Sequence, residues 1–349
     1  MAMCERVVPA LAGVAPVTPA LRMPDKIARL ESSRAQRRMQ ARPPLARRLN
    51  LGALHAEFTE LTVRFEADQG ALWCMFNHTE RPCFTPRLLD QIRSLQTRIE
   101  QGVAGSTDPA GMPLRSVIWT SAVPGVWNLG GDLALFTRLI RAGAEAELRR
   151  YAYTCVDAVY HNLIKANLPF LTIAMVHGDA LGGGFETVLS CDVVIAERGA
   201  KFGLPEVLFN LFPGMGAYSL LCRRLDGARA HKLMLSGRIY GAEELEEMGL
   251  VDLVVEPGEG PDAVRDYLER NRRRHDTLCA LSRVRQHCQP VSYDELIAVT
   301  GLWVETTLRL DDADLRRMEH LVRAQQRRYE RTRTEQTRAE QSLRISAVG

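Results

Sequence analysis

The chain has 349 residues, of which 46% are hydrophobic and 25% are charged, and its formal net charge at pH 7 is +3. This length and hydrophobic content suffice for one large α/β domain with additional segments, whereas so small a net charge argues against a nucleic-acid-binding protein. Residues 1–50 contain ten Lys or Arg but three Asp or Glu, so the remainder is mildly acidic. We expect a globular enzyme.

The eight cysteines are scattered through the chain, without a Cys-x-x-Cys pair or the His/Cys spacing of a zinc site. They therefore predict neither a metal centre nor a disulfide framework, and they favour a reducing cytoplasm. Residues 7–20 are apolar but contain three prolines and follow no basic segment, unlike a secretory signal. No run of eighteen apolar residues is present, so no membrane insertion is expected.

Folding signals begin after residues 1–50, an Ala/Pro/Arg-rich basic arm without periodicity that we expect to be disordered. Alternating residues in Leu61–Ala67, a turn, and the apolar run Ala71–Phe76 predict a β-hairpin. A helix is predicted from Pro86 to about Ile99, because apolar residues recur at helical spacing and proline is tolerated in the first turn.

Strands are then predicted at residues 116–120, 171–176 and 193–196, and glycine-containing turns lead from them into helical segments. A long helical region that is broken near Gly143 separates the first two of these strands. Repeated strand–turn–helix units imply crossover connections and parallel strands, so the fold class is α/β. We assign residues 51–256 to this core domain.

The pattern after Val255 is wholly helical, and Ser292 begins a capping box that predicts a helix start. We assign residues 257–330 to a C-terminal helical region. Residues 331–349 form a polar tail that we expect to fray.

Two glutamates carry the main chemical signal. Glu186 follows the triple-glycine turn Gly182–Gly184, and Glu206 follows Pro205, so each lies in the first turn of a helix among apolar neighbours. Carboxylates at helix starts also interact favourably with the helix dipole, which is an alternative reason for their presence. Burial would raise the pKa of both groups towards values suited to acid/base catalysis.

The glycines suggest a site for negative charge. Gly182–Gly184 and Gly130–Gly131 both lie at strand-to-helix junctions, where backbone N–H groups point outward. Two such turns can each contribute one N–H group to a single carbonyl oxygen, although a tight turn without a ligand is the alternative. We expect His177 to be packed or hydrogen-bonded, Cys191 to be a core residue and Asp132 to cap a helix.

Three stretches resemble the crotonase (enoyl-CoA hydratase) superfamily over about residues 60–330, namely His177–Asp192, Phe202–Ala217 and Leu235–Asp252. The resemblance implies a spiral of β-β-α turns with a helical C-terminal region, assembled as homotrimers or hexamers. It also implies an oxyanion hole formed by Gly131 and Gly183, with Glu186 and Glu206 as catalytic residues.

Within the superfamily the chain resembles the diffusible signal factor (DSF) synthases. The shared stretches are Val126–Phe136, Leu181–Glu186, Gly203–Phe209, Leu211–Tyr218 and Leu321–Gln325. Such enzymes make cis-2-unsaturated fatty acid signals from 3-hydroxyacyl-acyl carrier protein, by dehydration followed by thioester hydrolysis. The resemblance implies no cofactor beyond the acyl carrier protein or CoA thioester of the substrate. It places Met215, Trp303 and Leu321 in the acyl pocket, and we expect Leu302 and Met318 in the core.

Two other functions are also consistent with the sequence. One is a trans-2-enoyl-CoA hydratase of fatty-acid degradation, which would use the same pair of glutamates. The other is a non-enzymatic protein that binds a signalling partner, such as the receiver domain of a sensor kinase.

Overall fold

The computed structural model describes residues 48–54, 56–104 and 111–346. Contacts between residues divide the chain into two units, Met1–Pro44 and Leu45–Gly349, and the description below concerns the second unit. Nearly all of the expected basic arm lies outside the described residues. Its last described residues, Arg48–Leu49 (β1), pair with Met112–Pro113 (β4) and so belong to the folded unit.

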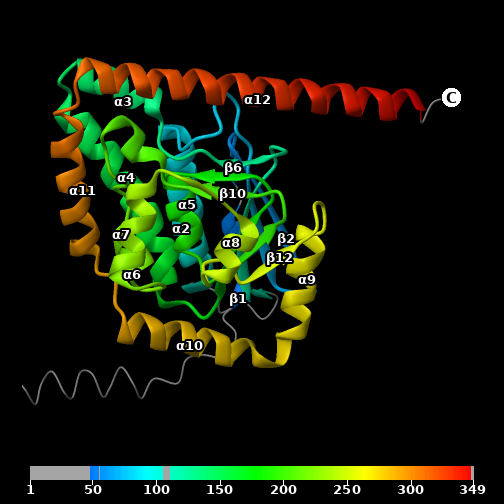
Figure 1. The fold of residues 1–349 in the computed structure, drawn as a ribbon. Helices are drawn as coiled ribbons and strands as arrows, with labels where there is room; N and C mark the ends of the chain where they lie inside the picture. Colours follow the sequence, from blue (N-terminus) through cyan, green and yellow to red (C-terminus); the bar gives the residue numbers. More distant parts are fainter. Residues whose placement is uncertain (1–47, 55, 105–110, 347–349) are drawn as a thin grey trace, which may run out of the picture. The chain divides into compact units, whose positions relative to one another are not determined.

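The centre of the fold is a six-stranded sheet (Figure 1). Its strands, in spatial order, are β12 (Leu253–Val255), β9 (Val193–Glu197), β7 (Leu171–Val176), β5 (Ser116–Ser121), β3 (Ala71–Phe76) and β2 (Leu61–Glu66). β2 and β3 form the predicted antiparallel hairpin, and the other neighbouring pairs are parallel. Every residue of β5 and β7 is buried, as expected for central parallel strands covered on both faces.

A second, four-stranded sheet lies beside the first. Its order is β11 (Ile239–Gly241), β10 (Lys201–Gly203), β8 (Asp179–Leu181) and β6 (Val126–Asn128). Each of β5, β7 and β9 is followed directly in the chain by a strand of this smaller sheet and then by a helical segment. The expected spiral of β-β-α turns is therefore confirmed.

Helices cover both faces of the larger sheet and surround the unit. The α-helices are α2 (Pro86–Ala104), α3 (Leu133–Arg141), α4 (Glu145–Ile164), α5 (Gly183–Leu189), α6 (Ala217–Cys222), α7 (Gly227–Ser236), α8 (Ala242–Glu247), α9 (Gly260–Arg270), α10 (His275–Cys288), α11 (Tyr293–Thr307) and α12 (Asp312–Ser346). Short 3-10 helices are η1 (Leu51–Leu54), η2 (Lys165–Asn167), η3 (Pro205–Phe209) and η4 (Arg272–Arg274). The last four α-helices run around the outside of the unit (Figure 1).

The C-terminal helices agree in part with the sequence. Ser292 caps α11 by accepting a hydrogen bond from the N–H of Glu295, as the capping box predicts. Met318 is fully buried as expected, but the expectation for Leu302 is wrong, because 59% of that residue is exposed on the outer face of α11. The expected start of the polar tail at residue 331 falls inside α12, which continues to Ser346.

None of the described helices combines the length and the apolar character that crossing a membrane requires.

Candidate active site

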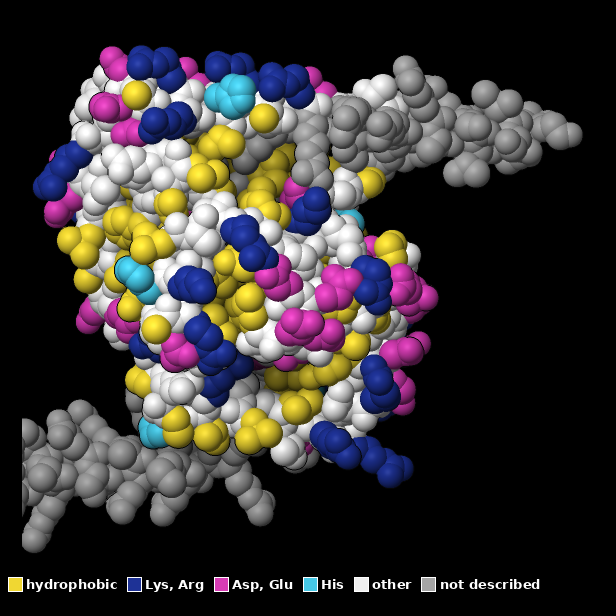
Figure 2. Space-filling model, in the orientation of Figure 1, with side chains coloured by type: hydrophobic (Ala, Val, Ile, Leu, Met, Phe, Trp, Pro, Cys, Tyr) yellow, Lys and Arg dark blue, Asp and Glu magenta, His cyan; other side chains and the backbone are white. Residues whose placement is uncertain are grey.

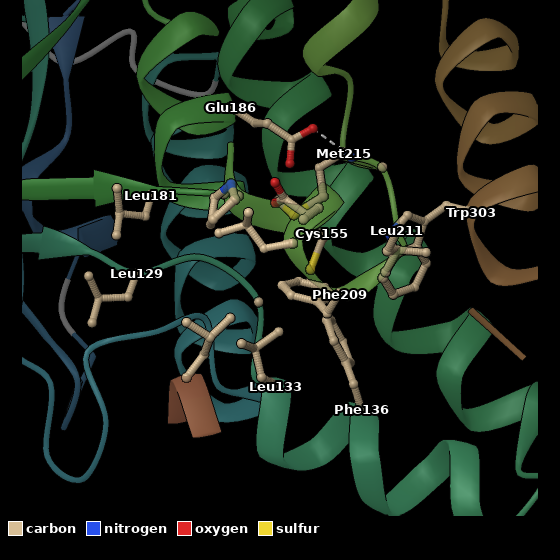
Figure 3. Close-up of a pocket in the computed structure, with 18 of the residues that line it drawn as sticks. Leu129, Leu133, Phe136, Cys155, Leu181, Glu186, Phe209, Leu211, Met215 and Trp303 are labelled. Atoms are coloured by element: carbon tan, nitrogen blue, oxygen red, sulfur yellow. Dashed lines mark hydrogen bonds between the residues drawn. The ribbon is translucent and has the colours of Figure 1, made fainter. Parts of the chain in front are cut away.

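Glu186 lies in the first turn of α5, directly after the triple-glycine turn. Gly182 has a φ of +53°, a left-handed conformation that strongly favours glycine, and this turn connects β8 to the start of α5. Glu186 is only 1% exposed, and its Oε1 accepts a hydrogen bond from the N–H group of Met215 (2.8 Å; Figure 3). The same oxygen also accepts from the N–H group of Ala217 (2.9 Å). Burial raises its pKa to about 7, although the two N–H groups partly oppose this effect.

Glu206 lies in η3 and faces the same cavity as Glu186. Its Oε1 lies so close to the glycine turn that a Cβ atom on Gly182 would be 2.7 Å away. Its Oε2 is buried and has no hydrogen-bond partner among the described residues. Burial, together with the nearby charge of Glu186, raises the pKa of Glu206 to about 8. Around neutral pH the pair therefore holds about one proton, as acid/base catalysis requires.

The two glycine turns meet beside these carboxylates. A Cβ atom on Gly130 would lie 2.8 Å from the nitrogen of Gly183, so the Gly130–Gly131 turn and the start of α5 are in direct contact. Within the described residues, no hydrogen bond engages the N–H group of Gly131 or that of Gly183. Both residues line the cavity that the glutamates face. The structure thus brings the four predicted catalytic and oxyanion-hole residues together.

Tyr151 is a residue that the sequence did not single out. Its hydroxyl donates to the carbonyl of Phe84 (2.5 Å) and accepts from the N–H of Asp132 (3.1 Å). The N–H of Phe84 in turn donates to the carbonyl of Gly130 (2.8 Å). Tyr151 therefore connects two chain segments around Gly131, and no local pattern in the sequence indicates this contact.

We expect the Tyr151→Phe substitution to lower kcat by about tenfold and to leave KM nearly unchanged, because it loosens the turn that holds the Gly131 N–H group. Losing a buried hydrogen bond should also reduce the free energy of unfolding by about 1–3 kcal/mol. Steady-state kinetics and urea unfolding measure both effects. Tyr160→Phe is the control, since the ring of Tyr160 contacts that of Tyr293 and Tyr160 does not line the cavity. Equal kinetic effects of the two substitutions would contradict this role.

Helix α11 covers the glycine loop that donates to Glu186. Trp303 packs so closely over Gly214 that a Cβ atom there would lie 2.3 Å from Cγ of the indole ring. Thr300 Oγ1 donates to the carbonyl of Gly214 (2.7 Å), and the ring of Trp303 lies 5.1 Å from that of Phe136. The position of the Met215 N–H group, and hence of Glu186, therefore depends on this C-terminal helix.

The cavity has a volume of about 270 Å³ and a mainly apolar lining. Met215, Trp303 and Leu321, the three expected acyl-pocket residues, all line it. Apart from these and the catalytic groups, the lining comprises Leu129, Leu133, Phe136, Tyr151, Ala152, Cys155, Leu181, Gly182, Pro205, Leu208, Phe209, Leu211, Gly214, Gly237, Ile239, Thr300 and Ala324. Figure 2 shows hydrophobic side chains in a hollow beneath α12, the helix that supplies Leu321 and Ala324.

The other candidate residues have structural partners. His177 Nε2 donates to the carbonyl of Val123 (3.1 Å), and burial lowers the pKa of this histidine. Burial raises the pKa of Cys191 to about 12, which suits a core thiol. Asp132 caps α3 as expected and also pairs with Arg81 (2.7 Å). No cluster of three or more potential metal ligands occurs in the described part of the chain.

The raised pKa of Glu206 predicts a pH-dependent stability difference. A carboxyl group whose pKa rises on folding binds its proton more tightly in the folded state, so the wild type loses stability as the pH rises from about 4.5 to about 8. Glu206→Gln removes this loss. We expect the variant to gain stability relative to wild type as the pH rises from 5 to 8.5. Urea unfolding at both pH values tests this, and a pH-independent difference would contradict it.

Part of the chain is similar in sequence to known hydratases. Residues 109–274 match the family model for enoyl-CoA hydratase/isomerase. Mitochondrial methylglutaconyl-CoA hydratase from Rattus norvegicus is 34% identical over 150 residues, which are 43% of this chain and 45% of that protein. The (E)-benzylidenesuccinyl-CoA hydratase from Thauera aromatica is 43% identical over 121 residues, or 33% of this chain and 47% of that protein. The chain thus spans less than half the length of these relatives.

Solved structures share the fold. DspI from Pseudomonas aeruginosa superposes with a TM-score of 0.56 and 24% identity, over 69% of this chain and 91% of that chain. A structure described as a putative enoyl-CoA hydratase from Streptomyces avermitilis gives a TM-score of 0.60 and 23% identity, over 78% and 92%. The chain is therefore similar in sequence to enoyl-CoA hydratase/isomerase proteins over part of its length, and it shares the fold of solved structures described as enoyl-CoA hydratases. The α/β fold with its helical C-terminal region is the crotonase-like fold.

Proposed function

We propose that the protein removes water from a 3-hydroxyacyl thioester. One observation carries this proposal: two buried glutamates with raised pKa values face one apolar cavity, beside two backbone N–H groups that no acceptor engages within the described residues. The N–H groups of Gly131 and Gly183 would hold the thioester oxygen as negative charge develops on it. Each such donor can contribute roughly 3–4 kcal/mol of transition-state stabilisation.

The reaction needs one base and one acid. A carboxylate takes the proton from the α-carbon, the resulting enolate-like charge is held in the oxyanion hole, and a carboxylic acid protonates the hydroxyl that leaves as water. By analogy with the hydratases run in reverse, Glu206 takes the α-proton and Glu186 gives its proton to the hydroxyl. General acid/base catalysis of this kind contributes about 10²–10⁴-fold in rate.

The finer proposal is the synthesis of a DSF-type signal. The substrate is then a 3-hydroxyacyl group on acyl carrier protein, the product of dehydration is a cis-2-enoyl thioester, and water releases the free acid in a second step. The same two N–H groups would hold the tetrahedral intermediate of that hydrolysis. The shared stretches around Leu129–Asp132 and Leu181–Glu186, and the apolar lining of the cavity, support this proposal.

Hydration of a trans-2-enoyl-CoA is the second candidate, and one observation favours it. Relatives that match part of this chain are named as hydratases, which add water to a double bond. Two buried carboxyl groups whose pKa values are both raised can serve the addition of water as well as its removal, because the same acid and base act in both directions.

Product analysis distinguishes the two candidates. The protein is incubated separately with 3-hydroxyacyl carrier protein and with crotonyl-CoA, and the products are identified by mass spectrometry. DSF synthesis is supported if the carrier-bound substrate yields a free cis-2-unsaturated acid. The same acid should appear when the protein is expressed in a host that makes no such signal. Efficient conversion of crotonyl-CoA alone, with no free acid, supports the hydratase. Binding of a sensor-kinase receiver domain with neither reaction would support the non-enzymatic alternative.

A further inference from the structure

A second, smaller void lies behind the wall of the catalytic cavity. It has a volume of about 20 Å³, and Phe76, Phe84 and Trp119 are among the side chains around it. Cys155 and Met215 line both this void and the catalytic cavity, so these two side chains form the partition between them. Figure 3 shows both residues in the lining of the catalytic cavity.

The inner void is suited to an apolar group rather than to water. Its three hydrogen-bonding amide and hydroxyl side chains, Gln96, Asn162 and Thr187, make hydrogen bonds within the protein at 2.9, 2.8 and 2.8 Å. A buried water needs two or more polar partners, and these side chains already have theirs. A volume of about 20 Å³ is enough for the terminal group of an alkyl chain once the side chains of the partition move.

The void lies at the deep end of the catalytic cavity. Leu208 and Ile239 line the cavity and are 52% and 41% exposed, so they mark its mouth. Cys155 is only 1% exposed and lies on α4, within the core of the unit. An acyl chain would enter the cavity past Leu208 and Ile239, and its thioester would lie at Gly131 and Gly183. The end of that acyl chain would then meet Cys155 and Met215.

We propose that the inner void is a subsite for the terminal carbons of the acyl chain, and that Cys155 and Met215 set the longest chain that fits. The inference rests on the proposed function, since it assumes an acyl thioester in the catalytic cavity. Met215 keeps its backbone N–H on Glu186 (2.8 Å), while its unbranched thioether can change conformation. Cys155 has a small side chain, so the volume of the residue at this position limits the access of an acyl chain to the inner void.

The test measures binding rather than turnover. Saturated acyl-CoA ketone analogues of increasing chain length, in which a methylene group replaces the thioester sulfur, are titrated into the wild type, Cys155→Ala and Cys155→Leu by calorimetry. These analogues keep the carbonyl group but can be neither dehydrated nor hydrolysed. Cys155→Ala should move the optimum about two carbons longer, with roughly fourfold tighter binding for each added methylene that enters the void. Cys155→Leu should move the optimum shorter. Cys191→Ala is the matched control, because Cys191 is equally buried and lines neither cavity.

The outcomes separate this inference from the proposed function. An optimum that is the same in the wild type and both Cys155 variants, each shown to be folded by circular dichroism, overturns the subsite while leaving the thioester site intact. Failure of the wild type to bind any of these acyl-CoA analogues overturns the proposed function and the subsite with it. If a Cys155 variant does not fold, Met215→Leu replaces it in the test. This substitution keeps the backbone N–H group and stiffens the partition, so it should shorten the acyl chain length that binds most tightly. An unchanged optimal chain length overturns the subsite.

Discussion

Replacing Glu186 with glutamine should lower kcat by roughly 10²–10⁴-fold while the fold remains intact. The amide keeps the shape of the side chain, and its oxygen can still accept the N–H groups of Met215 and Ala217. What it loses is the ability to give or take a proton. Steady-state kinetics measure the loss, and circular dichroism with urea unfolding shows whether the structure persists.

The control and a second variant sharpen this prediction. Glu197→Gln changes another buried glutamate, which accepts from Gly260 (3.2 Å) and does not line the cavity, so its activity should stay within about twofold of wild type. Because Glu186 and Glu206 act on one substrate as a pair, adding Glu206→Gln to Glu186→Gln should cost little further activity. If Glu186→Gln retains wild-type kcat, the acid/base mechanism is wrong.

Replacing Trp303 with alanine should have the largest effect on stability and change substrate preference. Trp303 is 6% exposed and packs on Gly214 and Phe136, so its removal leaves a cavity in the core, and such substitutions reduce the free energy of unfolding by about 3–5 kcal/mol. The loop that donates to Glu186 loses its support, so kcat should fall as well. The enlarged pocket should favour longer or branched acyl chains.

The neighbouring residue supplies the control for Trp303. Leu302→Ala changes a side chain that is 59% exposed, so its effect on stability should lie within about 0.5 kcal/mol. Trp303→Phe keeps an aromatic ring over Gly214 and should retain more stability than Trp303→Ala. Urea unfolding and product analysis across acyl lengths test these expectations. An unaltered product profile for Trp303→Ala would contradict the proposal that Trp303 contacts the acyl chain.

Local patterns in the sequence were sufficient for much of the fold. The alternation in Leu61–Ala67, the helical spacing after Pro86 and the cap at Ser292 each depend on residues close together in the chain, and the structure confirms all three. The expectation that Leu302 lies in the core was wrong because it, too, depended on local pattern alone. Its apolar character does not say which side of α11 faces the core, because that choice depends on helices and loops far away in the sequence.

The sequence also determined which residues could carry the chemistry, since Glu186, Glu206 and the two glycine turns stand out locally. Only the tertiary structure decided that the carboxylates face one cavity, that their burial raises both pKa values, and that the N–H group of Gly183 lies against the turn of Gly130. The contacts of Tyr151 around Gly131 and the position of Cys155 between the two cavities are likewise known only from the tertiary structure. The physical reason is that desolvation and contact between distant segments arise from packing, which the local order of residue types does not specify.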